Sequence, residues 1–267
     1  LYGDDGYYIK NNAIGGENDF ITSPEISQMF GETLSTFFIN YWKKNIKTEF
    51  NLIELGPGTG TLIVDILRTA NVDKNFLNAI NLTLIEKNEN LIFKQKNNLR
   101  DVNFYSAKWA QEIDIKKNNK PSIIYSNEFF DCFPVRQFYK KDKWYEKHIK
   151  YNSFKKNFNF IDKKVESNQL LKTLEKFNDV KVAEISDSRL NYFNLICKLI
   201  KKYKGVLITI DYGYKKPPNQ LTLQTIYNHK KTHLFENIGK QDITSHVDFN
   251  ELIFLANDNN LKIDLFC

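Results

Sequence analysis

A short glycine-rich loop constrains the fold of this sequence more than any other feature. The residues before the loop, Asn51 to Glu54, are typical of a buried strand, and residues 60–70 are typical of a helix. Between the two, three glycines alternate with other residues in Glu54-Leu55-Gly56-Pro57-Gly58-Thr59-Gly60-Thr61. Glycine permits a tight turn and lets the backbone come close to a ligand. The sequence therefore predicts a ligand-binding crossover in an α/β sheet.

The α/β alternation continues along the chain. We expect further strands at 82–86, 102–105, 122–126 and 205–211, and helices at 89–99 and 186–203. Such alternation predicts a Rossmann-like parallel sheet with helices on both faces. Before it, Thr22 and Glu25 have capping-box spacing and predict a helix that runs to about Trp42. After it, the residues 261–266 are strand-like.

An interruption of this pattern follows residue 134. Residues 135–161 alternate aromatic and charged side chains, with turn residues at 141–142 and 152–153, which indicates an antiparallel β insertion. We therefore expect an N-terminal helical segment, 1–50, that covers the ligand. The α/β core comprises 51–134 and 186–267, and the insertion with a helix comprises 135–185, on the substrate side.

Composition excludes several classes. The 267 residues are 42% hydrophobic, enough for one α/β domain with an insertion. No apolar run is long enough to span a bilayer. The net charge of +6 comes from short, scattered lysine clusters, so we predict no nucleic-acid partner. Three cysteines without a CxxC pair indicate a reducing compartment.

The spacing of the glycine loop favours a ligand other than a dinucleotide. The pattern is GxGxG rather than GxGxxG, and Pro57 removes an N–H that a phosphate would use. S-adenosylmethionine fits, because Glu54 can accept from its ammonium and Glu86, after the second strand, is placed for its ribose hydroxyls. Gly56, Gly58, Gly60 and Thr61 complete the expected cofactor site. A glycine turn in another α/β enzyme, including a dehydrogenase-like nucleotide binder, is the alternative.

The loop after the fourth strand carries candidate acceptor-binding residues. Asn127, Glu128 and Asp131 lie beside three phenylalanines, at the sheet edge where ligands bind. A carboxylate here would orient a cationic guanidinium, so we consider Glu128, Asp131 and Asp211 as catalytic acids, with Asn127 near the cofactor. In the alternative interpretation Glu128 caps a helix, Asp131 pairs with an arginine such as Arg136, and Asp211 orders a turn.

Histidine spacing gives weaker signals. His229 and His233 are four residues apart and would share one face of a helix, but no carboxylate completes a metal motif. We therefore predict no metal site. His246 is expected at a helix start or in the pocket.

Several segments together resemble the MidA-like proteins, a family that includes the mitochondrial assembly factor for respiratory complex I. The matching segments run in order along nearly the whole chain, at residues 6–8, 19–27, 30–32, 54–62, 65–68, 127–131, 211–214 and 242–249. The chain differs from the family at Thr59, where arginine is usual. The family is also longer at both ends, so we expect this sequence, which begins at Leu1 without a methionine, to be trimmed.

The resemblance implies a class I methyltransferase fold with a seven-stranded sheet. It implies symmetric dimethylation of an arginine in a protein substrate, a complex I subunit. The family's N-terminal segment, which covers the cofactor, corresponds to Asp19, Thr22, Ser23 and Pro24, and its acidic loop suggests Glu128 as the guanidinium-binding acid. A non-catalytic assembly factor and a small-molecule methyltransferase are the alternatives. The expected compartment is a bacterial cytoplasm or, alternatively, the mitochondrial matrix, and the oligomeric state is left open.

Overall fold

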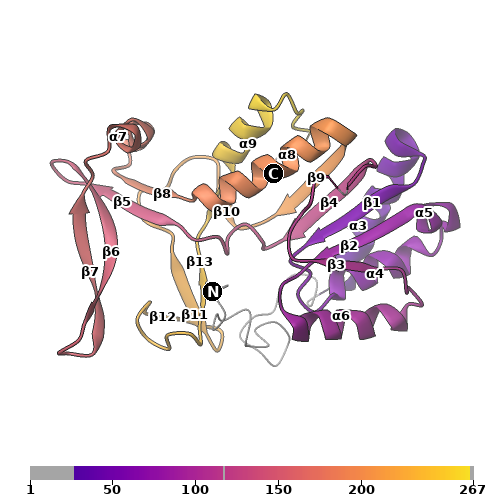
Figure 1. The fold of residues 1–267 in the computed structure, drawn as a ribbon, viewed down its shortest axis with the longest axis horizontal. Coiled ribbons are helices and arrows are strands. Elements are labelled where there is room, and N and C mark those ends of the chain that lie inside the picture. Colours follow the sequence, from indigo (N-terminus) through magenta and orange to yellow (C-terminus); the bar gives the residue numbers. More distant parts are fainter. Residues whose placement is uncertain (1–26, 117, 265–267) are drawn as a thin grey trace.

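A five-stranded parallel sheet in the order β3-β2-β1-β4-β9 forms the centre of the structure (Figure 1). The computed structural model describes residues 27–116 and 118–264. The strands are β1 (Phe50–Leu55), β2 (Ile80–Ile85), β3 (Lys108–Ala110), β4 (Ser122–Asn127) and β9 (Gly205–Ile210). Because β1 pairs in parallel with both β2 and β4, the loops that follow these three strands leave the same edge of the sheet.

Helices cover both faces of this sheet, as the alternation predicts. One face packs against α3 (Gln28–Tyr41), which continues as a π-helical turn η1 (Trp42–Ile46), and against α4 (Thr61–Ala70), α5 (Lys74–Ala79) and α6 (Glu89–Asp101). The other face packs against α8 (Asp187–Tyr203) and α9 (Phe249–Asp258). Successive strand side chains point to opposite faces, so Leu52 belongs to the first core and Ile53 to the second. The predicted Rossmann-like class is confirmed.

A second sheet, antiparallel and in the order β7-β6-β5-β8, extends to one side (Figure 1). Its strands are β5 (Arg136–Lys140), β6 (Trp144–Asn152), β7 (Asn157–Lys164) and β8 (Val182–Ile185). The helix α7 (Asn168–Leu174) and the 3-10 turn η2 (Glu175–Phe177) cover one face, where Phe138, Trp144 and Phe177 form a separate core. These elements occupy the segment in which the sequence predicts an antiparallel insertion.

The segment between β9 and α9 has a structure that the sequence pattern did not predict. It forms a three-stranded sheet from β11 (Gln224–Tyr227), β12 (Lys230–Thr232) and β13 (Asp242–Thr244), and a short parallel pair, β10 (Gly213–Tyr214) with β14 (Val247–Asp248). His229 lies with Asn228 in the tight β11–β12 turn, and both have positive φ. The two histidines therefore do not share a helix face.

The predicted third strand, 102–105, is wrong. These residues end α6: Asn103 has a φ of 57° and the Phe104 N–H bonds to the Leu99 carbonyl at 3.0 Å, so the chain turns back before any strand begins. The strand that pairs with the other side of β2 is β3, which begins three residues after the predicted strand. The short helix α5 was also missed; its cap is Asp73, whose carboxylate accepts from the Phe76 N–H at 3.0 Å.

The two ends of the chain differ from the prediction or lie outside the described residues. The described residues of the predicted last strand, 261–264, have no regular structure, and the parallel sheet has five strands among residues 27–116 and 118–264 rather than seven. The chain after β9 enters the small sheets instead of extending the central one. The capping box of Thr22 and Glu25 lies outside the described residues; the described helix begins after Ser27.

Gly205 shows how closely β4 and β9 approach one another. It has a φ of 141° and lies opposite Ser122, and a Cβ at this position would lie 2.0 Å from the Ser122 carbonyl oxygen. Since that obstacle is backbone rather than a flexible side chain, the first residue pair of the β4–β9 ladder requires glycine.

Gly205→Ala should therefore destabilise the fold by about 3 kcal/mol or more, because the two strands must separate to admit the methyl group. Gly239→Ala is the matched control: it also has a positive φ, 78°, but nothing lies within 4 Å of its added Cβ. Chemical denaturation of both variants measures the difference. Equal losses in the two variants would contradict the close approach.

Candidate functional site

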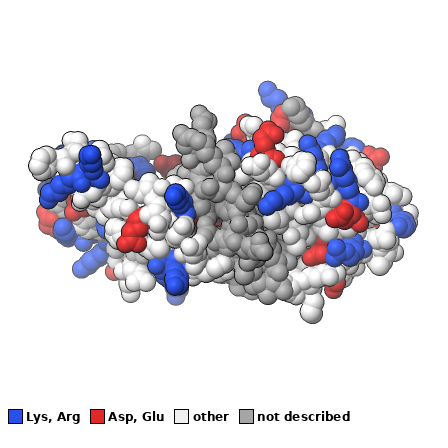
Figure 2. All heavy atoms as spheres, turned by 90° about the horizontal axis from the view of Figure 1, so that it is seen from below, with Lys and Arg blue, Asp and Glu red and all other residues white. Residues whose placement is uncertain are grey.

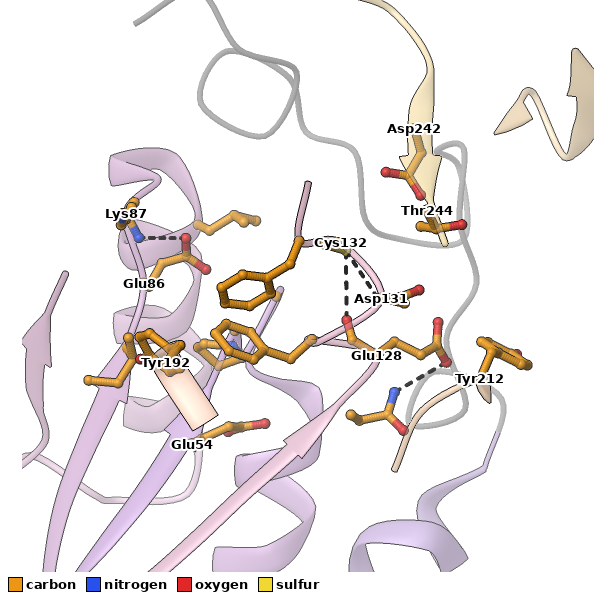
Figure 3. A pocket seen from close by; sticks show the side chains of 18 of the residues that line it. Glu54, Glu86, Lys87, Glu128, Asp131, Cys132, Tyr192, Tyr212, Asp242 and Thr244 are labelled. Carbon is orange, nitrogen blue, oxygen red and sulfur yellow. Dashed lines mark hydrogen bonds between the residues drawn. The ribbon is translucent and has the colours of Figure 1, made fainter. Parts of the chain in front are cut away.

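A cavity of about 510 Å³ lies at the carboxyl ends of the central strands (Figure 3). One end is formed by the glycine loop after β1 and by the residues after β2 and β3. The other end is formed by the loop after β4, by Tyr212 after β9, and by residues of β11, β13 and the segment that follows β13. The open edge of the parallel sheet thus holds a site with two differently composed ends.

The three glycines of the loop all have a backbone conformation that favours glycine. Gly56, Gly58 and Gly60 have φ angles of 63°, 54° and 83°, a region that side chains with a Cβ rarely adopt. A Cβ on Gly56 would lie 2.9 Å from the Phe129 ring, and one on Gly60 would lie 3.1 Å from the Gln95 side chain. The loop is therefore fitted on one side to the β4 loop and on the other to α6.

Side chains from α6 hold the glycine loop in place. Gln95, fully buried, donates to the Gly58 carbonyl at 2.7 Å and accepts from the Trp109 indole N–H at 2.8 Å. Asn98 donates to the Thr59 carbonyl at 2.9 Å. Within the loop, the Thr59 and Thr61 hydroxyls lie 2.9 Å apart. Because α6 side chains bind the Gly58 and Thr59 carbonyls, the loop backbone is held in place before any ligand binds.

Glu54 lines the cavity, and its side chain is buried. The Tyr125 hydroxyl donates to its carboxylate at 3.0 Å. Burial raises the pKa of Glu54 from 4.5 to about 8, against the opposing hydrogen bond of Tyr125, and the nearby Glu86 adds to the rise. Without a cationic ligand, Glu54 therefore carries a proton at neutral pH.

Glu86 lies directly after β2 and is half-buried. One carboxylate oxygen accepts from the backbone N–H groups of Lys87 and Asn88 at 2.8 and 2.9 Å, and the other is 3.4 Å from the Gln95 amide nitrogen. Burial raises its pKa, and the backbone hydrogen bonds partly offset the rise. The carboxylate is thus fixed in orientation at the cavity wall.

The loop after β4 brings Asn127 and Glu128 to the cavity. Glu128 has a φ of 49°, and its N–H continues the sheet by bonding to the Ile210 carbonyl at 2.8 Å. The Asn127 amide donates to the Glu128 carboxylate at 3.3 Å, while the buried Asn127 Oδ1 accepts no hydrogen bond among the described residues. Glu128 caps no described helix, and Arg136 pairs with Glu146 at 2.7 Å rather than with Asp131.

Asp211 supports this loop and is absent from the cavity wall. One carboxylate oxygen accepts from the N–H groups of Phe129, Phe130 and Asp131 at 3.2, 2.8 and 3.2 Å, and the other from the Tyr212 N–H at 2.9 Å. These four bonds fix the loop. Burial raises the Asp211 pKa to about 6, and the backbone bonds oppose the rise.

The buried Arg189 ties the same loop to the segment after β13. Its guanidinium donates to the Phe130 carbonyl at 2.8 Å, the Ser245 hydroxyl at 2.9 Å and the His246 carbonyl at 3.3 Å. The Ser245 N–H in turn bonds to the Asp131 carbonyl at 3.0 Å. The two walls of the cavity are therefore held together by the Arg189 side chain and by this backbone hydrogen bond.

Three carboxyl groups meet at this end of the cavity: Glu128 and Asp131 from the β4 loop, and Asp242 from β13 (Figure 3). Asp131 and Asp242 are both buried. Burial raises the pKa of Asp131 well above its usual range, and the charges of Asp211, Asp242 and Glu128 raise it further. Glu128 also raises the pKa of Tyr212. Mutual repulsion of this kind favours a cation between the acids.

The structure places most of the sequence-predicted residues around this one cavity. Those that line it are Glu54, Gly56, Gly58, Thr61, Glu86, Asn127, Glu128, Asp131 and His246. Gly60 caps α4 behind the loop, and Thr22 and Ser23 lie outside the described residues. Within residues 27–116 and 118–264, no three His, Cys, Asp or Glu side chains are arranged so that they could hold a metal ion, and no helix is long and apolar enough to cross a membrane.

Several site residues were not predicted from the sequence. Asp242, Thr244 and Tyr212 line the cavity, and Gln95 and Arg189 support it. Asp242 and Tyr212 belong to segments that carry the family resemblance, and that resemblance was the only sign in the sequence that they could belong to the site. Gln95 lies mid-helix in a polar stretch, and its role depends on the approach of α6 to the glycine loop.

The pH dependence of stability should report the buried Glu54. Above pH 4.5 the unfolded chain releases this proton, whereas the folded chain keeps it until about pH 8, so folding becomes less favourable as pH rises through this range. Glu54→Gln keeps the shape but cannot ionise, so its free energy of unfolding should exceed that of the wild type increasingly with pH, by on the order of several kcal/mol at pH 8.

Denaturation of both proteins between pH 5 and pH 8 measures this difference. The control is Glu89→Gln, which makes the same substitution at an exposed carboxyl group on α6. A constant gap between Glu54→Gln and the wild type across this range would show that Glu54 is ionised throughout.

Comparison with known proteins places this site in a family. Residues 33–267 match the family model described as a putative S-adenosyl-L-methionine-dependent methyltransferase. The mitochondrial protein arginine methyltransferase NDUFAF7 of Mus musculus is 29% identical over 94% of this chain and 62% of its own length, and that of Homo sapiens is 30% identical over 94% and 62%. The chain thus spans about three fifths of the length of these relatives.

A solved structure shares the fold. A likely methyltransferase of the COG1565 superfamily from Burkholderia thailandensis, bound to S-adenosyl-homocysteine, aligns with a TM-score of 0.82 over 97% of this chain and 69% of its own, at 22% identity. The predicted fold, family resemblance and cofactor are therefore confirmed. The chain belongs to this family of S-adenosyl-L-methionine-dependent methyltransferases.

Proposed function

We propose that this chain is a protein arginine N-methyltransferase that uses S-adenosylmethionine. The charge of the cavity carries the proposal. Among the described residues that line it are six acids, Glu54, Glu86, Glu112, Glu128, Asp131 and Asp242, and one lysine, Lys87, although the whole chain has a net charge of +6. A basic protein that gathers acids in one cavity is suited to cationic ligands.

The cofactor end fits S-adenosylmethionine. The positive-φ glycines let backbone approach the ligand, and the fixed carboxylate of Glu86 would bind the ribose hydroxyls. Glu54 would accept from the ammonium, directly or through water, and would release its proton on doing so. Thr61 and Asn127 also line this region, and the unbonded Asn127 Oδ1 offers an acceptor. Through Thr22 and Ser23, the first part of the N-terminal segment 1–50 would cover the cofactor, whereas α3 and η1 of that segment pack against the sheet.

The acceptor end fits a guanidinium. Bound in the cavity, the cofactor would supply an electrophilic methyl group. Glu128 would hold the guanidinium and favour a lone pair on one nitrogen, and the buried Asp131 and Asp242 would offset its positive charge. The proton that the nitrogen gives up would pass to one of these carboxyl groups. Asp211 acts through the loop as a positioning residue, because its carboxylate is taken up by backbone N–H groups.

The names of the relatives support an arginine acceptor, since those proteins are described as protein arginine methyltransferases. The family resemblance adds the finer proposal of symmetric dimethylation on a subunit of respiratory complex I, in support of its assembly. The insertion 135–185 would lie on the substrate side. The chain would then act where complex I assembles, in a bacterial cytoplasm or in the mitochondrial matrix; the relatives named mitochondrial support the second compartment.

Glu128→Gln should lower methyl transfer to arginine by about a hundredfold or more, because an uncharged amide cannot balance the guanidinium. Its affinity for S-adenosylmethionine should stay near that of the wild type. The assay counts tritium transferred from labelled S-adenosylmethionine into protein, and acid hydrolysis identifies the methylated amino acid.

Glu175→Gln, at an exposed position in η2, is the matched control and should retain full activity. Symmetric dimethylarginine in the hydrolysate would support the full proposal. Label on a small molecule, or on another amino acid, would overturn the arginine assignment. Cofactor binding without transfer, together with a cellular role that survives Glu128→Gln, would instead indicate an assembly factor that no longer catalyses.

A further inference from the structure

The β6–β7 hairpin carries an exposed apolar surface. Cross-strand pairs place Tyr151 opposite Phe158 and Ile149 opposite Phe160, so all four side chains lie on one face. Their exposed fractions are 52%, 36%, 55% and 40%. Large apolar side chains gathered in this way on a protein surface mark an interaction site more often than single ones do. We name these four residues, together with Phe235, the aromatic face.

Phe235 joins the aromatic face to the sheet that lines the cavity. It lies between β12 and β13, and its ring centroid is 4.8 Å from that of Phe160 and 6.0 Å from that of Phe158. The same loop is held rigidly, because the buried Gln241 donates to the His233 and Leu234 carbonyls at 3.2 and 2.9 Å. The next residue along the chain is Asp242, in the cavity wall.

A second link fixes the two sheets to one another. The buried Glu184 of β8 accepts from the Gln137 amide at 2.7 Å within its own sheet, and from the N–H groups of Thr222 and Leu223 at 3.0 Å each, just before β11. The aromatic face therefore has a defined position relative to the cavity, at the outer side of the small sheet (Figure 1).

The hairpin that carries the aromatic face is rich in lysine. From Lys143 to Lys164 it has seven lysines and two acids. Lys147 and Lys164 lie on the aromatic face by strand alternation, together with Asp162, which is paired with Lys147 across the strands. The Lys147 ammonium lies 5.1 Å from the centre of the Phe160 ring, on the same face. Figure 2 shows blue side chains, and fewer red ones, spread over this lobe, with uncoloured surface between them. The surface thus combines apolar contact area with lysines.

We propose that the aromatic face docks the protein substrate, through apolar and acidic side chains that flank its methyl-accepting arginine. The inference rests on the proposed function. A second copy of this chain would bring the same lysines together, and a nucleic acid would offer no cation to the acid-lined cavity. A segment with an arginine next to acidic and apolar residues complements both surfaces at once.

Binding of defined peptides tests the docking. The probe is a fluorescent peptide with one arginine flanked by leucines and three glutamates, and its comparison has lysines in place of the glutamates. The acidic peptide should bind the wild type more tightly. Its Kd should rise about tenfold or more in the double variant Ile149→Ser/Phe160→Ser, and also in Lys147→Glu, because each removes part of the surface. Fluorescence anisotropy measures these values.

Phe254→Ser on α9, at a side chain that is 69% exposed, is the matched control and should bind like the wild type. Equal binding of the acidic peptide by wild type and double variant would overturn the docking proposal. So would tighter binding of the lysine peptide or of a single-stranded oligonucleotide, or a wild-type dimer that the double variant abolishes in light scattering.

A third peptide separates this inference from the proposed function. With glutamine in place of its arginine, the acidic peptide should still lose affinity in the double variant, since docking does not need the guanidinium. If the arginine and glutamine peptides bind the wild type equally, the guanidinium site fails while the docking face stands. If only the arginine matters, the docking face fails while the guanidinium site stands.

Discussion

The parallel pairing of β1 with β2 and β4 is the constraint on which the site depends. It sends the glycine loop, Glu86 and Glu128 to one edge of the sheet, although they are far apart in the sequence. The three loops are then fitted to one another. The Phe129 ring of the β4 loop lies 2.9 Å from the position that a Cβ on Gly56 would take, and Gln95 of α6 binds the Gly58 carbonyl. A change in one loop therefore acts on both ends of the cavity.

The second constraint is electrostatic. Burying Glu54, Asp131 and Asp242 costs free energy in the absence of a cation, as the raised pKa values of Glu54 and Asp131 indicate. The backbone N–H groups that surround Asp211 and the guanidinium of Arg189 hold this arrangement together. Repulsion among the acids is thus maintained by the fold, and a bound cation would relieve it. The outer surface of the insertion has the opposite charge, which complements acidic flanks of a substrate.

Part of this arrangement could be predicted from the sequence. The glycine loop and the acids after β2 and β4 follow from local patterns, because parallel strands bring their carboxyl ends to one edge. The insertion followed from aromatic alternation. The third strand failed because the positive φ of Asn103 turns the chain at the end of α6. The roles of Asp242 and Arg189 depend on contacts between distant segments, which leave no periodic pattern in the local sequence. The strands of the β11–β13 sheet are too short to show the alternation of a strand.

Calorimetric titration of the full-length protein with S-adenosylmethionine is the measurement that tests the account most directly. The geometry of the cofactor end predicts saturable binding with a Kd in about the micromolar range. It also predicts a proton release that makes the observed heat depend on the buffer, because Glu54 must ionise to meet the ammonium. Absence of heat and of any thermal shift with S-adenosylmethionine, especially alongside protection by NAD, would contradict the account.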